Sequence, residues 1–337
     1  MKKNIRKALA AIMIMILGIG LGGCAKTTAD KTPVKLPEVK IAASQGAGSY
    51  PLAPMAENNA LQSIADKTTI ESWVTNEQLS AMVTSNQVQF IMAPMTNAIM
   101  LYNKGASVKL ANVAVWGMLY VLSADNSVKS LADLKGKQIA VTGGSTGYHG
   151  TVFRHILIKN GIDPDKDLTI LNMDMAESSS KLATGEIKLA LSNEPNSSVA
   201  IANAAKGNVT VIRAIDLQVE WGKATGSKAR IPQAGLIVVG ENAGNTALVN
   251  EVLKQFDANA KWINENPAAA GPVVEKYFPK MKAGAVEKSL PFARLEPVSS
   301  PQCKDEVNVF LTEYLKTAPP ASIGGKIPDD NFYYSGN

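Results

Sequence analysis

Residues Ser127–Val141 read SVKSLADLKGKQIAV, and a glycine-rich loop, Gly143–Gly147, follows after one residue. The serine and aspartate of the first half are typical of a short capped turn over Ser130–Gly136. The second half is a short run bounded by turn residues, which predicts a strand over Lys137–Thr142. The residues after the loop predict a helix over Tyr148–Asn160, which a glycine ends. A strand, a loop and a helix in this order form one unit of a sheet that is covered by helices.

The same alternation runs through most of the chain. Thr75–Gln78 has the form of a capping box at the start of a further helix. The C-terminal part is predicted to be mostly helical, with an irregular end from Pro319. Alternating strands and helices indicate an α/β protein with mainly parallel sheets flanked by helices. The predicted strands lie at residues 39–42, 69–73, 88–92, 168–173, 187–191, 209–212 and 235–239, and the predicted helices include 54–64, 177–184, 246–264, 267–277 and 304–316.

Size, charge and cysteine content exclude several classes of protein. A chain of 337 residues is too long for one compact core and suits two lobes. Four of the 34 lysines and arginines fall within the first seven residues, and the other 30 are balanced by 29 acidic residues, which argues against nucleic-acid binding. His149 and His155 do not form a zinc-binding spacing, so no metal is expected. Cys303 is the single cysteine after Cys24, and we expect it to be a small buried hydrophobe.

The first two dozen residues have the order of an export signal. Four basic residues precede an apolar run over Ala8–Leu17, and the segment ends in Leu21–Cys24, which reads LGGC. The final cysteine matches the bacterial lipobox. The alternative, one retained transmembrane helix, is disfavoured because the apolar stretch is shorter than the ~20 residues that span a bilayer. We therefore expect a signal peptide over residues 1–23, a lipid on Cys24 and a flexible tether over residues 24–38.

Three motifs resemble those of periplasmic solute-binding proteins. Ser127–Val141 resembles their I-x-S-L-A-D-L-K-G-K-x-V-A-V stretch. Gly144–Thr146 resembles the G-S-T turn of the nitrate, sulfonate and taurine branch, which also includes binders of pyrimidine precursors. Asn193–Pro195 resembles the W-E-P corner of that branch, with an asparagine in place of the tryptophan, so the class of ligand stays open. The similarity extends from about residue 40 to residue 278.

The resemblance implies a two-lobed receptor for an ABC importer, with the type II (Venus-flytrap) periplasmic-binding-protein fold. Lobe one would comprise residues 39–121 and 236–337, and lobe two residues 122–235. Leu119–Ala124 and Ala234–Val239 would cross between the lobes. The expected partners are a small-molecule ligand, the permease and ATPase of the importer, and the membrane through the lipid. We expect a monomer outside the cytoplasm, at the cell surface or in the periplasm, without a cofactor and without nucleic acid.

Ligands of open α/β sheets bind beyond the carboxyl ends of the strands, which makes the loops after the predicted strands the candidate site. The glycine-rich loop suits an anion, because the following helix would direct its free N–H groups and positive dipole end there. The alternative is that Ser145 or Thr146 only caps that helix. Glu194 either binds an amine or caps the next helix, and the aromatic candidates either wall the site or pack in the core. The expected ligand contacts are Gln45, Ser49, Tyr50, Trp73, Thr96, Asn97, Trp116, Gly144, Ser145, Thr146, Tyr148, Asp174, Glu194 and Asn196.

No set of residues predicts catalysis. The sequence has no recognisable Ser-His-Asp or paired-carboxylate arrangement, and it lacks the cysteine-rich signature of the pyrimidine synthases that share the implied fold. The sequence therefore favours a protein that captures a small polar or anionic molecule, such as a sulfonate, nitrate, taurine or a heterocycle. Two alternatives stay open: an exported sensory or docking lipoprotein, and an enzyme of the pyrimidine-synthase or dehydratase type.

Overall fold

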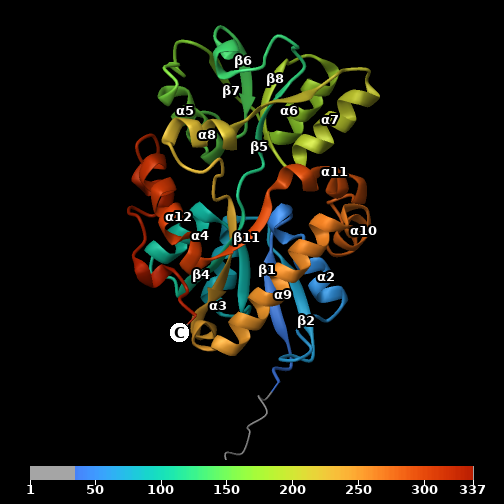
Figure 1. Ribbon diagram of the computed structural model, residues 1–337, viewed down its shortest axis with the longest axis vertical. Coiled ribbons are helices and arrows are strands. Elements are labelled where there is room, and N and C mark those ends of the chain that lie inside the picture. The colour runs from blue at the N-terminus through green and yellow to red at the C-terminus, as the bar shows by residue number, and fades with distance from the viewer. Residues whose placement is uncertain (1–34, 337) are drawn as a thin grey trace, which may run out of the picture. The chain divides into compact units, whose positions relative to one another are not determined.

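The computed structural model describes residues 35–336, whose strands form two separate sheets (Figure 1). The expected signal peptide and Cys24 lie outside the described residues. Leu36, within the expected tether, already donates a hydrogen bond to the carbonyl of Ile64. The first sheet has the strand order β11-β4-β10-β3-β1-β2, and the second has the order β7-β6-β8-β5-β9. The strands are β1 (Val39–Ala43), β2 (Thr68–Ser72), β3 (Phe90–Pro94), β4 (Val108–Val115), β5 (Leu119–Ser123), β6 (Gln138–Val141), β7 (Thr169–Asn172), β8 (Leu189–Asn193), β9 (Ile212–Asp216), β10 (Ala234–Val239) and β11 (Leu295–Ser299).

Most strands of each sheet run in one direction, as expected, but both sheets are mixed, because β5, β10 and β11 run the opposite way. β1 is parallel to β2 and β3, but β10 is antiparallel to β3 and β4, and β11 is antiparallel to β4. In the second sheet β6 is parallel to β7 and β8, whereas β5 is antiparallel to β8 and β9. β5 is the first strand after the chain leaves the first sheet, and β10 is the first strand after it returns. The alternation of strands and helices indicates the class of fold, but it does not give the direction in which a distant strand enters a sheet.

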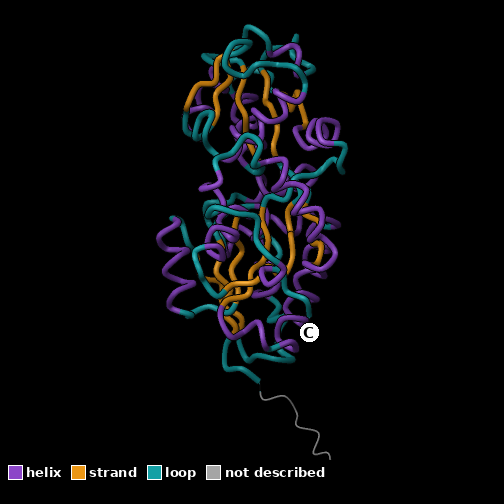
Figure 2. Tube along the Cα trace, turned by 90° about the vertical axis from the view of Figure 1, so that its left-hand side faces the viewer, coloured by secondary structure: helices purple, strands orange, loops and turns teal. Residues whose placement is uncertain are grey.

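Helices flank both sheets (Figure 2), and local signals set several of their ends. The predicted capping box is present: the Thr75 side chain accepts a hydrogen bond from the Gln78 amide, and the Gln78 side chain accepts one from the Thr75 amide. No helix of the described residues is both long enough and apolar enough to cross a membrane. The helices are α2 (Leu52–Glu57), α3 (Asn76–Ser85), α4 (Met95–Asn103), α5 (Tyr148–Lys159), α6 (Met175–Thr184), α7 (Asn196–Lys206), α8 (Leu217–Thr225), α9 (Thr246–Glu265), α10 (Pro267–Tyr277), α11 (Ala283–Ala293) and α12 (Ser300–Tyr314).

Two stretches of backbone join the sheets. The first lies between the end of β4 and the start of β5, and the second, residues 226–233, leads from α8 to β10. The expected crossing segments, Leu119–Ala124 and Ala234–Val239, therefore coincide largely with strands β5 and β10, and the crossings themselves lie just before them in the chain. The expected boundary between residues 121 and 122 falls inside β5.

A glutamine of α8 holds the first crossing in place. Gln218 is fully buried, its amide nitrogen donates to the Leu119 carbonyl at 3.1 Å, and its amide oxygen accepts from the Leu119 amide at 3.0 Å. The crossing passes so close that a Cβ on Gly117 would lie 2.6 Å from Cγ of Gln218. Only glycine fits at this position without displacing the glutamine.

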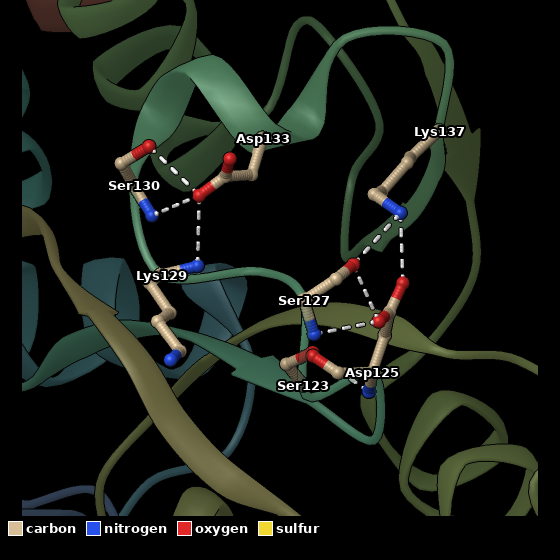
Figure 3. Close-up of polar contacts among 7 residues, drawn as sticks. All are labelled: Ser123, Asp125, Ser127, Lys129, Ser130, Asp133 and Lys137. Atoms are coloured by element: carbon tan, nitrogen blue, oxygen red, sulfur yellow. Dashed lines mark hydrogen bonds and ion pairs between the residues drawn. The ribbon is translucent and has the colours of Figure 1, made fainter.

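Ser127–Val141, the stretch that resembles solute-binding proteins, begins with a structural turn (Figure 3). Asp133 accepts hydrogen bonds from the amide and hydroxyl of Ser130 and from the Lys129 amide. Asp125 accepts from Ser127 and pairs with the Lys137 ammonium group at 2.7 Å. Together these contacts fix the chain that leads into β6.

Aromatic side chains join α12 to the helices of the second sheet. Phe310 on α12 lies with its ring centroid 5.1 Å from Trp221 of α8 and 6.5 Å from Tyr148 of α5. Tyr314, one turn further along α12, lies 5.7 Å from Tyr148. Because α12 also packs on β4 of the first sheet, this cluster is a shared apolar contact between the two halves of the protein.

The expectation for Cys303 is confirmed. This residue of α12 is fully buried and forms no disulfide. Burial raises the pKa of its thiol to about 12.

Replacing Phe310 by alanine tests the contribution of the aromatic cluster. Phe310 is 2% exposed, so Phe310→Ala should lower the free energy of unfolding by about 3 to 5 kcal/mol, as loss of a buried ring typically does. Val309→Ala, the neighbouring position on the same helix, is the matched control, because Val309 is 47% exposed. Urea unfolding measures the free energy of unfolding of both variants. Equal values for the two would contradict a contribution of the aromatic cluster to stability.

Candidate functional site

A cavity of about 340 Å³ lies between the two sheets, at the ends of strands from both. The first half of the protein contributes the loop after β1, the end of β3 and the first turn of α4. The second half contributes the start of α5 and the corner between β8 and α7, and both crossings complete the wall. The lining residues are Ser44, Gln45, Gly46, Ala47, Gly48, Ser49, Met92, Ala93, Pro94, Thr96, Asn97, Met118, Tyr148, His149, Asn193, Glu194, Pro195, Asn196, Gln233 and Ala234.

Three helices begin at this cavity, and among the described residues two of them, α4 and α5, have no side-chain cap, whereas Glu194 caps α7. The residues before α4, α5 and α7 are Pro94, Gly147 and Pro195, and none of them supplies a side-chain hydrogen bond to the helix. By contrast, α3, α6 and α8 are capped by Thr75, Asp174 and Asp216, away from the cavity lining. The first amides of a helix have no intrahelical partner, and the dipole makes this end positive. The starts of α4 and α5 therefore favour a negatively charged group at the cavity without a cationic side chain.

The polar side chains of the lining are almost all neutral. No lysine or arginine belongs to the lining. Gln233, on the second crossing, is only 5% exposed, and its amide nitrogen has no hydrogen-bond partner among the described residues. Its backbone carbonyl accepts from the Met95 amide at 3.0 Å and so attaches the crossing to the start of α4. Such an unpaired buried donor costs free energy unless a ligand or a water satisfies it.

Glu194 is the single carboxylate of the lining, and its oxygens already have partners. It is 1% exposed, and one oxygen accepts from Nε of Arg213 at 2.7 Å. The other oxygen accepts from the hydroxyl of Ser198 at 2.7 Å and from its amide at 3.2 Å. Burial raises the pKa of Glu194, while Arg213 and Ser198 oppose that rise. These bonds cap α7 and hold the β8–α7 corner, which is the capping role that the sequence left open.

His149 on the first turn of α5 is a neutral group of the wall. Burial lowers the pKa of its imidazole to about 4. At neutral pH the ring therefore offers one N–H donor and one acceptor nitrogen. No hydrogen bond occupies this ring within the part of the chain that the structure describes.

Several expected contacts lie elsewhere. Tyr50 is fully buried, with its hydroxyl 3.0 Å from that of Ser289, and Trp116 is buried beneath the guanidinium of Arg230. The Asp174 carboxylate caps α6 by accepting from the Glu177 amide. Trp73 lines an adjoining hollow.

The glycine-rich loop that the sequence favoured most lies outside the lining. Gly144, Ser145 and Thr146 are not among the lining residues, although the helix that follows them does begin at the cavity. The loop packs on that helix so closely that a Cβ on Gly150 would lie 1.9 Å from the Gly144 carbonyl oxygen. The small residues thus permit close packing within the loop. Of the expected contacts, those brought together at the cavity are Gln45, Ser49, Thr96, Asn97, Tyr148, Glu194 and Asn196.

No sequence motif surrounds Gln233, and only the antiparallel return of β10 brings it to the site, so it could not be selected from the sequence. His149 was visible only as the neighbour of Tyr148, at the start of a predicted helix.

Solved structures with this fold include components of ABC importers. The crystal structure of an ABC transporter from Parabacteroides distasonis matches with a TM-score of 0.73 at 20% identity, over 88% of this chain and 98% of that chain. The periplasmic aliphatic sulphonate-binding protein SsuA from Escherichia coli matches with a TM-score of 0.62 at 16% identity, over 82% and 93%. The periplasmic nitrate-binding protein NrtA from Synechocystis PCC 6803 matches with a TM-score of 0.57 at 13% identity, over 85% and 84%. These likenesses show that the chain has the two-lobed fold of periplasmic binding proteins.

The family model described as NMT1/THI5 like matches residues 69–270, which is more than half of the chain. The chain belongs to the NMT1/THI5-like family. The fold class and the resemblance inferred from the sequence are thereby confirmed. No curated protein matches the chain.

The protonation of His149 can be measured directly. We expect an NMR titration of the folded protein to place its midpoint near pH 4, well below the value of 6.5 for an unperturbed histidine. His149→Gln identifies the resonance, because the pKa of His155 is also lowered. A midpoint near 6.5 would contradict a buried neutral ring.

The lowered pKa of His149 also determines how the free energy of unfolding changes with pH. Between pH 6.5 and 4 the unfolded chain takes up the proton of His149 before the folded protein does, so the free energy of unfolding falls as the pH is lowered. His149→Gln should therefore lose less stability than the parent protein over this interval.

Proposed function

We propose that the protein is an extracytoplasmic solute-binding lipoprotein that captures a small polar or anionic molecule and delivers it to an ABC importer. The observation that carries the proposal is the cavity between the sheets, where the uncapped starts of α4 and α5 lie together with the unpaired amide nitrogen of Gln233. The descriptions of similar structures as sulphonate-binding and nitrate-binding proteins support it.

The lining indicates the chemistry of the ligand. With helix amides and neutral side chains as donors, an anion would be held by oriented dipoles rather than by an arginine fork. Met92, Met118 and Tyr148 add an apolar surface, and methionine adapts readily to ligand shape. Since a cavity of about 340 Å³ is within the range of sites for organic ligands, a sulfonate or an anionic heterocycle fits better than nitrate alone.

The side chains of the cavity favour binding without catalysis. Within the described residues, His149 has no hydrogen-bonded carboxylate or hydroxyl partner, and Glu194 is engaged by Arg213 and Ser198. A general base must be free to accept a proton and must lie within reach of it. His149 has no such partner in the part of the chain that the structure describes, and Glu194 is not free. The fully buried thiol of Cys303 lies outside the lining.

Capture would work by closure of two lobes, which we place on either side of the two crossings: residues 39–115 with 234–337, and residues 119–225. A ligand that contacts both lobes only when they are closed shifts the population towards the closed state. We further propose, from the sequence of residues 1–24, that a signal peptide directs export and that a lipid on Cys24 anchors the monomer to the membrane.

A substitution at the β8–α7 corner tests the site. Asn196 is an exposed residue of the lining, so Asn196→Trp should fill the cavity and leave the melting temperature of the free protein nearly unchanged. A thermal-shift screen of sulfonates, nitrate, pyrimidines and aromatic acids identifies a ligand of the parent protein. The variant should bind that ligand about 10- to 100-fold more weakly, as overpacking typically causes.

Asn203→Trp is the matched control, because Asn203 is exposed on the same helix outside the cavity lining. It should bind as the parent protein does. Equal affinity of Asn196→Trp and the control would reject the site, and turnover of any screened compound would reject the proposed function.

Small-angle X-ray scattering tests closure. Saturation with a ligand found in the screen should decrease the radius of gyration of the parent protein, because both lobes then contact the ligand. Asn196→Trp at the same ligand concentration should show no decrease. An unchanged radius for the saturated parent protein would argue against hinged lobes.

A further inference from the structure

A second hollow of about 420 Å³, here called the outer chamber, adjoins the cavity. Ser44, Gln45, Pro195 and Asn196 line both, so the two spaces share a wall. The outer chamber extends from that wall to the end of β2, to α7 and to the segment between α10 and α11. Its further lining residues are Trp73, Val74, Val199, Lys280, Met281, Lys282, Ala285 and Val286.

The outer chamber differs from the cavity in its charge. The cavity lining has no cationic side chain, whereas the outer chamber has Lys280 and Lys282. Lys282 pairs with Glu275 at 2.9 Å. Lys280 is exposed and forms no ion pair with the described residues, so its charge is available at the rim.

The outer chamber also has an apolar surface from both halves of the protein. Val74, two residues before α3, is 71% exposed, and Val199 on α7 is 36% exposed. Both line the outer chamber together with Trp73. Single exposed apolar residues are ordinary, but two on opposite sides of one hollow, beside a tryptophan, form a surface that suits an aliphatic or aromatic chain.

We infer that the site accepts an elongated molecule with two acidic ends. One anionic end occupies the cavity at the uncapped helix starts, an apolar middle lies on Trp73, Val74 and Val199, and the second acidic group reaches Lys280. This inference rests on the proposed function and extends it, because it names a class of ligand that spans both spaces.

The experiment compares three probes by isothermal titration calorimetry at low salt. Methanesulfonate reports the head group alone, a straight-chain alkanesulfonate adds an apolar tail, and an ω-carboxyalkanesulfonate of the same length adds the second charge. We expect the carboxylate-ended probe to bind about threefold more tightly than the methyl-ended one, as an exposed ion pair allows. Added salt should remove this advantage, because it screens exposed charges.

Substitution of the lysine isolates the second contact. Lys280→Ala should abolish the advantage of the carboxylate-ended probe and leave the affinity for the methyl-ended probe unchanged, and Lys280→Glu should reverse the preference. Lys206→Ala, at an exposed lysine of α7 outside both linings, is the control and should retain the advantage.

The probes distinguish failure of the two-ended ligand from failure of the proposed binding function. If methanesulfonate or the methyl-ended probe binds but the carboxylate brings no gain, or the gain survives in Lys280→Ala, the two-ended ligand is wrong while the proposed binding function stands. If no probe binds, anion capture at the cavity is rejected, and the two-ended ligand with it.

Discussion

The antiparallel insertion of β10 between β3 and β4 is the constraint on which the site depends. Ala234 pairs with Pro94 on one side and Val115 on the other, so the returning chain enters the first sheet where β3 ends and α4 begins. Gly235 makes this possible, because a Cβ there would lie 2.2 Å from the Asn112 carbonyl oxygen. The close pairing places Gln233 beside the first turn of α4, and one crossing thus becomes part of the cavity wall.

The sequence predicted well the helix starts and ends that neighbouring residues determine. The capping box at Thr75, the start of α5 at Tyr148 and the bounds of α10 all depend on neighbours within a few positions, and the structure has them. α8, α11 and β11 were not predicted, and β5 was expected only as a crossing segment. The place of β4 in the sheet could not be predicted either. It is buried along nearly its whole length between β10 and β11, so its residues show no alternation of polar and apolar side chains, and its partners come from far along the chain.

The residues of the candidate site likewise fall into those that the local sequence predicts and those that it does not. Polar residues that come within three positions of the end of a strand, such as Thr96 after β3 and Asn196 after β8, could be selected from the sequence and do lie at the cavity. The glycine-rich loop shows the limit of that reasoning. Small residues permit either a bound ligand or the chain's own backbone to approach, and here the backbone of Gly144 approaches Gly150. Only the packed structure distinguishes the two uses of the same sequence.

The burial of Cys303 has a consequence for how the protein matures. If residues 1–24 direct export as proposed, Cys24 is consumed by the lipid and Cys303 is the last thiol. A thiol that is protonated and enclosed by α12 is a poor nucleophile for disulfide exchange. The folded protein then needs neither a thiol oxidase nor a disulfide isomerase, and it resists cross-linking to neighbouring proteins in an oxidising environment.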